Sequence, residues 1–282
     1  MKIKYGYTCL VGLFLSLCIV SCKTTFHLAI PSEFSDNASK MPAKGLGKKY
    51  MSFGSYKTSK IKRGWNPGSS RRTGSFGQRF IEDRLLRDFG ISANNIRAKE
   101  KGRFEFTILS GNSWAAIYAR EQKETNNLRI KTNSDLGIFN NMDFLKNYEY
   151  SFLATIFPDS SMYKEPWKLF ISNSYNAFTD TTRKFFELAT GNEHGYATDG
   201  KDSIFIKAIF IKKAIKENGK EAKIPVKMLG GYELRWEDGV VCVIDAIKRN
   251  VWMYNDLEEK DKFILSVISS AIMLRRVQDI RK

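Results

Sequence analysis

The sequence is poor in histidine, and it lacks the short motifs that mark common catalytic centres. Only His27 and His194 occur among 282 residues, which disfavours histidine-based catalysis and histidine-rich metal sites. The patterns GxSxG, HExxH, CxxC, the phosphate-binding loop and the dinucleotide-binding loop are also missing. Because the residues show no catalytic centre, we expect a protein that is not an enzyme and that needs no cofactor or metal.

Cysteine is almost confined to the N-terminus. Cys9, Cys18 and Cys22 lie there, and Cys242 stands alone in an apolar, strand-like run. A single cysteine cannot form an internal disulfide, and a buried cysteine behaves mostly as a small apolar residue. We therefore expect Cys242 to be a core residue and not a nucleophile.

The N-terminus has the pattern of an export signal. Lys2 and Lys4 precede residues 9–20, an uncharged run shorter than the roughly 20 residues that a membrane-spanning helix needs. At the end of this run stand Ile19 and Val20, which Ser21 and Cys22 follow. This combination resembles the lipobox of bacterial lipoproteins, although that family prefers Leu where Ile19 stands. An ordinary secretory signal or an uncleaved anchor is the alternative.

The resemblance implies a specific fate for this segment. Residues 1–21 would be a signal peptide, and Cys22 would become the mature N-terminus and carry lipid such as palmitate. The protein would then be anchored to a membrane of the cell envelope. Lys23 stands where an Asp retains enteric lipoproteins in the inner membrane, so we expect the outer membrane.

Residues 22–44 contain Pro31 and Pro42 and no sustained hydrophobic period, so we expect a tether. The remaining residues, 45–282, are expected to form a single β-rich domain. With 43% hydrophobic residues and 20 Phe, the chain has enough apolar material for a core, which excludes disorder of the whole chain.

Residues 40–79 carry the strongest charge feature. They hold eleven Lys and Arg with no Asp or Glu, interleaved with aromatic residues, in a chain of net charge +16. An exported protein rarely meets nucleic acid, so we expect an anionic lipid, an acidic glycan or a protein as the partner. The residues expected to bind it are Lys57, Lys60, Lys62, Arg63, Trp65, Arg71 and Arg72. The alternative is a solvated face whose aromatic rings pack inward.

The body of the chain alternates large and polar residues with turn signals between the runs. This pattern predicts antiparallel strands at 104–108, 114–118, 148–157, 167–171, 184–189, 204–211, 231–236, 240–247 and 251–254. Turn residues at 110–112 and 237–239 predict that the flanking strands form two hairpins, around Gly111 and around Gly239. A brief helix is predicted over 80–89, and His194 is expected in a loop. Few helices interrupt the strands, which favours an antiparallel all-β body over βαβ units.

The C-terminus predicts a helix over 256–280. Residues 263–274 carry no charge and spread apolar side chains over a far wider arc than the stripe of about 100° on a surface helix. The helix must therefore be enclosed. Ser266, Ser269 and Ser270 can bond back to helix carbonyls. The basic residues Arg275, Arg276, Arg281 and Lys282 are expected to return to water.

A β body around one apolar C-terminal helix resembles the tubby-like fold of tubby C-terminal domains, phospholipid scramblases and LURP-one-related proteins. The matching stretch includes Tyr232-Glu233-Leu234, Asp238-Gly239, residues 240–245, Val251-Trp252-Met253 and residues 256–274. The resemblance implies a barrel and a lipid-related role, but it assigns no binding residue, because the tubby phosphoinositide signature has no counterpart here. The competing architecture is a β-sandwich with the helix on one face.

These observations leave two functions open. The first is a membrane-anchored envelope lipoprotein whose non-catalytic β domain binds an anionic lipid, glycan or protein partner. The second is an envelope glycan hydrolase that uses a pair of carboxylates. The candidates closest in sequence are Glu233, Glu237, Asp238 and Asp245, although Glu237 and Asp238 also suit a turn.

Overall fold

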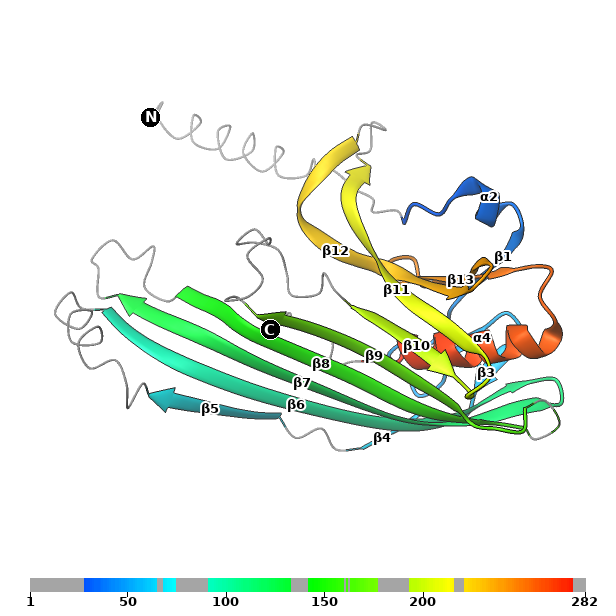
Figure 1. Cartoon of the computed structure of the whole chain (residues 1–282), viewed down its shortest axis with the longest axis horizontal. Helices are drawn as coiled ribbons and strands as arrows, with labels where there is room; N and C mark the ends of the chain where they lie inside the picture. The colour runs from blue at the N-terminus through cyan, green and yellow to red at the C-terminus, as the bar shows by residue number, and fades with distance from the viewer. Residues whose placement is uncertain are drawn as a thin grey trace, which may run out of the picture.

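The computed structural model describes residues 28–64, 68–74, 91–132, 142–159, 161, 163–176, 193–215 and 221–275. These residues form one antiparallel sheet of fourteen strands, the helix α4 (Glu259–Met273) and the single turn α2 (Ser32–Ser35) (Figure 1). The strands are β1 (Ala38–Pro42), β2 (Ser52–Phe53), β3 (Tyr56–Thr58), β4 (Lys62–Arg63), β5 (Gly68–Gly74), β6 (Ile91–Ser110), β7 (Ser113–Thr132), β8 (Met142–Pro158), β9 (Trp167–Asn176), β10 (His194–Thr198), β11 (Ser203–Ile215), β12 (Glu221–Trp236), β13 (Gly239–Asp245) and β14 (Asn250–Tyr254). The predicted mainly-β fold with one C-terminal helix is confirmed.

The sheet curves into a nearly closed barrel. Its strand order is β1-β14-β13-β12-β11-β10-β9-β8-β7-β6-β3-β2, with β4 and β5 also paired to β6. The two ends of this order meet at one bridge, where Lys44 N donates to Ser52 O at 2.8 Å and Ser52 N donates to Lys44 O at 3.1 Å. Pairing of this kind leaves little of the edge exposed and favours the barrel over the sandwich.

The N-terminal boundary predicted at residue 45 is wrong. β1 pairs with β14 from Ala38 to Pro42, inside the stretch 22–44 that we expected to be a tether. Leu28 also lies close to Gly230 and Gly231 of β12. β1 escapes a hydrophobic-period search because it is short and half exposed and joins the sheet through its backbone.

Helix α4 fills the barrel. Residues 263–272 are all buried, and Figure 1 shows the helix between β6–β9 and the strands β1 and β13. Ser266 Oγ donates to Phe263 O at 2.6 Å and Ser270 Oγ donates to Ser266 O at 2.8 Å. The expected enclosure of the helix is therefore confirmed, and so is the bonding of Ser266 and Ser270 to helix carbonyls, whereas the hydroxyl of Ser269 lies 3.5 Å from Cys242 Sγ. No helix among the described residues is long and apolar enough to cross a membrane.

The C-terminal end of α4 corrects a sequence expectation. The helix ends at Met273, whereas we predicted 256–280. Arg275 does not return to water, because its side chain is buried against Glu193, and Arg276 and the residues after it lie outside the described part. Arg63 Nη2 donates to the carbonyl of Leu274 at 2.9 Å, which satisfies one backbone group at the helix end.

The hairpins predicted around Gly111 and Gly239 are confirmed. Strands β6, β7 and β12 are longer than expected, whereas β13 ends at Asp245 and not at 247. β6 and β7 pair without a break from Ser110↔Ser113 to Ile91↔Thr132, and Figure 1 shows them continuing past the barrel as a curved extension with β5 and β8. His194 begins strand β10, where we expected a loop. The predicted helix 80–89 and strand 184–189 lie outside the described residues.

Candidate anion-binding site

The strands β6, β7 and β8 present two different faces. Phe104, Ile117 and Phe152 point into the barrel and are at most 3% exposed. The residues that alternate with them point outward, because successive side chains of a strand lie on opposite faces. The outward residues include Arg103, Arg120 and Leu153, all exposed.

Two arginines stand directly opposite each other on this outer face. Arg103 of β6 pairs with Arg120 of β7, a position that brings the two Cβ atoms to about 5 Å. No carboxylate of the described residues pairs with either guanidinium. Like charges at this position repel, and the repulsion costs the sheet stability. A bound anion would remove that cost, so the pair has the chemistry of an anion site.

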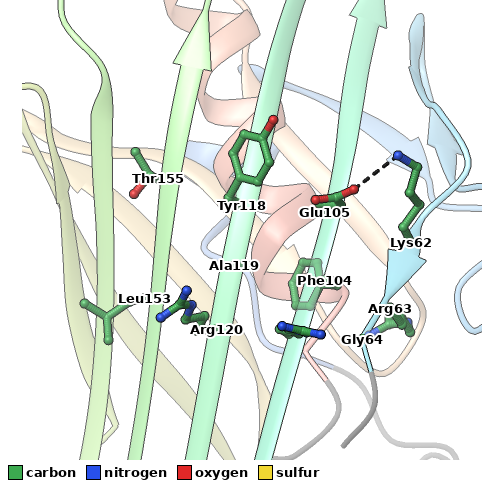
Figure 2. A pocket seen from close by; sticks show the side chains of 11 residues that line it. Lys62, Arg63, Gly64, Phe104, Glu105, Tyr118, Ala119, Arg120, Leu153 and Thr155 are labelled. Atoms are coloured by element: carbon green, nitrogen blue, oxygen red, sulfur yellow. Dashed lines mark hydrogen bonds and ion pairs between the residues drawn. The ribbon is translucent and has the colours of Figure 1, made fainter.

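The arginines line two open hollows of about 710 Å³ and 570 Å³. Lys62 and Tyr118 border the first hollow, Lys101 borders the second, and Leu153 borders both. Figure 2 shows the first hollow from outside, with Lys62, Tyr118, Arg120 and Leu153 around it. Cations and apolar groups therefore share one concave surface.

Gly64 leaves the space that the side chain of Arg103 occupies. A Cβ at Gly64 would collide with the Nε, Cγ and Cδ atoms of Arg103. The backbone of the two residues is also joined, since Gly64 N donates to Arg103 O at 3.0 Å. The missing side chain of Gly64 thus lets Arg103 lie across the β4–β6 seam.

Lys62 is paired but accessible. Its Nζ lies 3.2 Å from Glu105 Oε1, with the two side chains 72% and 44% exposed (Figure 2). Exposed pairs of this kind contribute only about 0.2–1 kcal/mol. The ammonium group of Lys62 can therefore turn toward an anion in the first hollow at little cost.

The seven residues that we expected to bind an anionic partner fall into three groups in the structure. Lys62 and Arg63 line the first hollow. Arg63, however, also binds the end of α4 and lies 5.1 Å from the Phe104 ring centre, so its role there is structural. Lys57, Lys60 and Arg71 are exposed outside both hollows, while Trp65 and the side chain of Arg72 lie outside the described part.

Sequence reasoning missed Lys101, Arg103 and Arg120. The signal was present in the predicted hairpin, because a turn at Gly111 that pairs Ser110 with Ser113 also places Arg103 opposite Arg120. Counting the register outward from the turn would have found the pair.

A second polar cluster lies at the inner end of α4. Arg275 Nη1 donates to Glu193 Oε1 at 2.6 Å, and Tyr232 Oη donates to the same oxygen at 3.0 Å. The guanidinium also lies 4.9 Å from the Tyr232 ring centre. Burial acts to lower the pKa of Arg275, but Glu193 holds that pKa well above its usual range. Arg275, Glu193 and Tyr232 thus connect the C-terminal end of α4 to β10 and β12, and we interpret their role as structural.

The carboxylates considered for glycoside hydrolysis take part in an ion pair and in hydrogen bonds to the backbone. Glu233 Oε2 lies 3.4 Å from Arg235 Nη1, and Asp245 Oδ1 accepts from Ile247 N at 3.0 Å and Lys248 N at 2.9 Å. Of the described residues, Glu105 is the only carboxylate in the first hollow and Glu121 the only one in the second. Neither hollow thus brings together the two carboxyl groups that glycoside hydrolysis uses.

No protein-family model, no curated protein and no solved structure matches the chain. The lipoprotein and tubby-like resemblances thus stay predictions from the sequence.

Proposed function

We propose that this protein is a membrane-anchored envelope lipoprotein whose β domain binds anionic groups without catalysis. The observation that carries the binding proposal is the opposed pair Arg103 and Arg120, which lacks a carboxylate partner among the described residues. The anchoring part rests on the lipobox-like sequence that ends at Cys22.

The chemistry of the hollow favours a phosphate-type oxyanion. Each guanidinium presents a planar fork of donors that matches two oxygens of a phosphate or carboxylate group. Lys62 and Lys101 add two point charges at the borders. Leu153 offers an apolar contact beside them, which suits a ligand that carries a non-polar portion next to its charge.

Binding is tested on the full-length protein in detergent by calorimetric titration with inositol hexakisphosphate as a soluble probe. The variant R103Q/R120Q is expected to lose about 10- to 100-fold in affinity, because each charge-assisted contact contributes roughly 1.5–3 kcal/mol and water replaces part of it. The matched control K60Q/R71Q removes two exposed cations outside the hollows and is expected to bind like the wild type. Equal losses in both variants would show only diffuse attraction by the net charge and would reject the site.

Anchoring is tested by labelling cells with radioactive palmitate. The label is expected on the wild type and on the control Cys18→Ala, and it is expected to be lost in Cys22→Ala. Label that persists in Cys22→Ala would reject the lipid attachment at this residue.

A further inference from the structure

Exposed apolar side chains gather on one surface of this protein. Among the described residues, eight large apolar side chains are exposed, and all but Tyr50 belong to β6, β7, β8, β10 and β11. These seven are Leu109, Trp114, Tyr118, Leu153, Phe157, Tyr196 and Phe205, each 43–54% exposed. Scattered apolar residues are normal on a surface, whereas a contiguous patch marks an interaction site.

Strand register aligns part of this surface into a row. Leu153 of β8 pairs with Phe170 of β9, Phe170 with Tyr196 of β10, and Tyr196 with Phe205 of β11. Directly paired residues share a face, so the four side chains form one outward line across four adjacent strands. At about 4.8 Å between strands, the row is about 14 Å long. We call these four residues the apolar row.

Arginines stand at both ends of the apolar row. Leu153 pairs with Arg120, which pairs with Arg103, and Phe205 pairs with Arg235 on the other side. The line across seven strands therefore carries two arginines, four apolar side chains and one further arginine. The proposed anion site is thus one end of a longer surface.

The charges around the apolar row are mostly positive. Lys168 stands two positions before Phe170 on β9, and Lys207 stands two positions after Phe205 on β11. Both lysines lie on the outward face, on opposite sides of the row, and both are exposed. The acids Glu105 and Glu233 already pair with Lys62 and Arg235 of the same face. The surface thus keeps a positive surplus, and charge complementarity requires an anionic occupant.

The shape of the apolar row favours a fluid occupant over a glycan. Leu153 has no ring, and the Phe170 and Tyr196 rings are tilted by 51° to each other, so the row offers no flat platform for stacked sugars. Side chains that reach the acyl boundary while neighbouring cations meet headgroup phosphates are the means by which peripheral proteins bind membranes.

We propose that the apolar row docks this protein onto the surface of an anionic phospholipid bilayer. Leu153, Phe170, Tyr196 and Phe205 enter the interfacial region, and Arg103 and Arg120 bind lipid phosphates at one end of the row. The inference rests on the proposed function, because it assigns the anion of the arginine pair to phospholipid headgroups. It makes the outer face of β8–β11 the side that faces the membrane.

The test is vesicle co-sedimentation of residues 23–282, the mature chain without Cys22, which carries neither a lipid on Cys22 nor the apolar run of residues 9–20. Vesicles of phosphatidylcholine with phosphatidylglycerol are compared with vesicles of phosphatidylcholine alone. Binding is expected only to the anionic vesicles. Adding L153S/F205S is expected to weaken that binding at least about tenfold, while the control Tyr50→Ser, which changes an exposed ring outside the surface, leaves it unchanged.

The soluble probe separates the two proposals. L153S/F205S is expected to bind inositol hexakisphosphate like the parent protein, whereas R103Q/R120Q weakens both the probe and, by about 30-fold, the vesicles. Probe binding without vesicle binding would reject membrane docking and leave the anion site intact, and loss of both in the parent protein would reject the two proposals together. Undiminished vesicle binding by L153S/F205S, or a dimer that these substitutions dissociate, would also overturn membrane docking. Because both side chains are exposed, the melting temperature is expected to stay that of the parent.

Discussion

The guanidinium of Arg275 and the carboxylate of Glu193 meet inside the barrel, with 2.6 Å between Nη1 and Oε1 and 1% of each side chain exposed. The two residues lie 82 positions apart in the chain. Their contact ties the end of α4 to the start of β10, at the place where the apolar interior of the barrel becomes polar.

Breaking this pair is expected to destabilise the protein strongly. Arg275→Met or Glu193→Gln should each lower the free energy of unfolding by about 3–5 kcal/mol, because each leaves a buried charge without the opposite charge that compensates it. Urea denaturation measures the loss. The double variant should lose clearly less than the sum, and the exposed pair Lys62–Glu105, changed to K62Q/E105Q, should lose under about 1 kcal/mol. Additive losses in the buried pair would contradict direct coupling.

Gly64→Ala is expected to weaken anion binding without unfolding the protein. The new methyl group collides with the flexible side chain of Arg103, which can move aside and thereby leaves its position opposite Arg120. Titration with inositol hexakisphosphate should show a loss of about 3- to 10-fold, as for one misplaced contact to a charged group. Gly68→Ala is the control, since nothing lies within 4 Å of a Cβ there. Unchanged affinity in Gly64→Ala would show that Arg103 needs no such support.

Cys242 is expected to make stability fall at alkaline pH. Burial raises the pKa of its thiol from 9.0 to about 12, against the hydrogen bond with Ser269. The unfolded chain therefore loses the proton first, so stability is full below pH 9.0 and declines as pH rises toward about 12. The slope from this group approaches about 1.4 kcal/mol per pH unit. Denaturation at stepped pH should show a shallower decline in Cys242→Ala, and identical declines would contradict the assignment.

Two neighbouring glycines of β12 are expected to differ in their tolerance of alanine. A Cβ at Gly231 meets the backbone carbonyl oxygen of Ile244, which cannot move without the strand, whereas a Cβ at Gly230 meets the side chains of Ile211 and Leu28. Gly231→Ala should therefore cost about 1–3 kcal/mol and Gly230→Ala less. Thermal unfolding of the two variants side by side checks the order, and a larger loss at Gly230 would contradict it.

The sequence carried the parts of the fold that rest on strong local signals. The turn at Gly239 and the apolar span of residues 263–274 predict a hairpin and an enclosed helix, because turn chemistry and burial act over a few residues. The full lengths of β6 and β7 escaped prediction. Beyond the barrel, their inward positions include Glu100 and Lys123, which pair with each other at 3.3 Å, so the alternation of apolar and polar residues fades.

In the candidate site, too, the sequence predicts residues that belong to a local pattern but not residues that depend on long-range pairing. Lys62 is visible as part of a basic run, but Arg120 gains its meaning only when register places it opposite Arg103. Arg275 follows an apolar helix, where a basic residue is usually solvated, and its partner Glu193 is far away in sequence. Such pairings belong to the tertiary structure and leave no local pattern.

The position of α4 in the chain bears on how the protein reaches its native state during synthesis. Every described strand precedes the helix in sequence, yet the inner faces of those strands pack against it. The ribosome therefore releases the strands of the barrel before the helix that fills it. Until residues 259–273 emerge, the nascent strands expose apolar surface that favours aggregation. A chaperone that holds the unfinished chain would have to stay bound until this helix has been made.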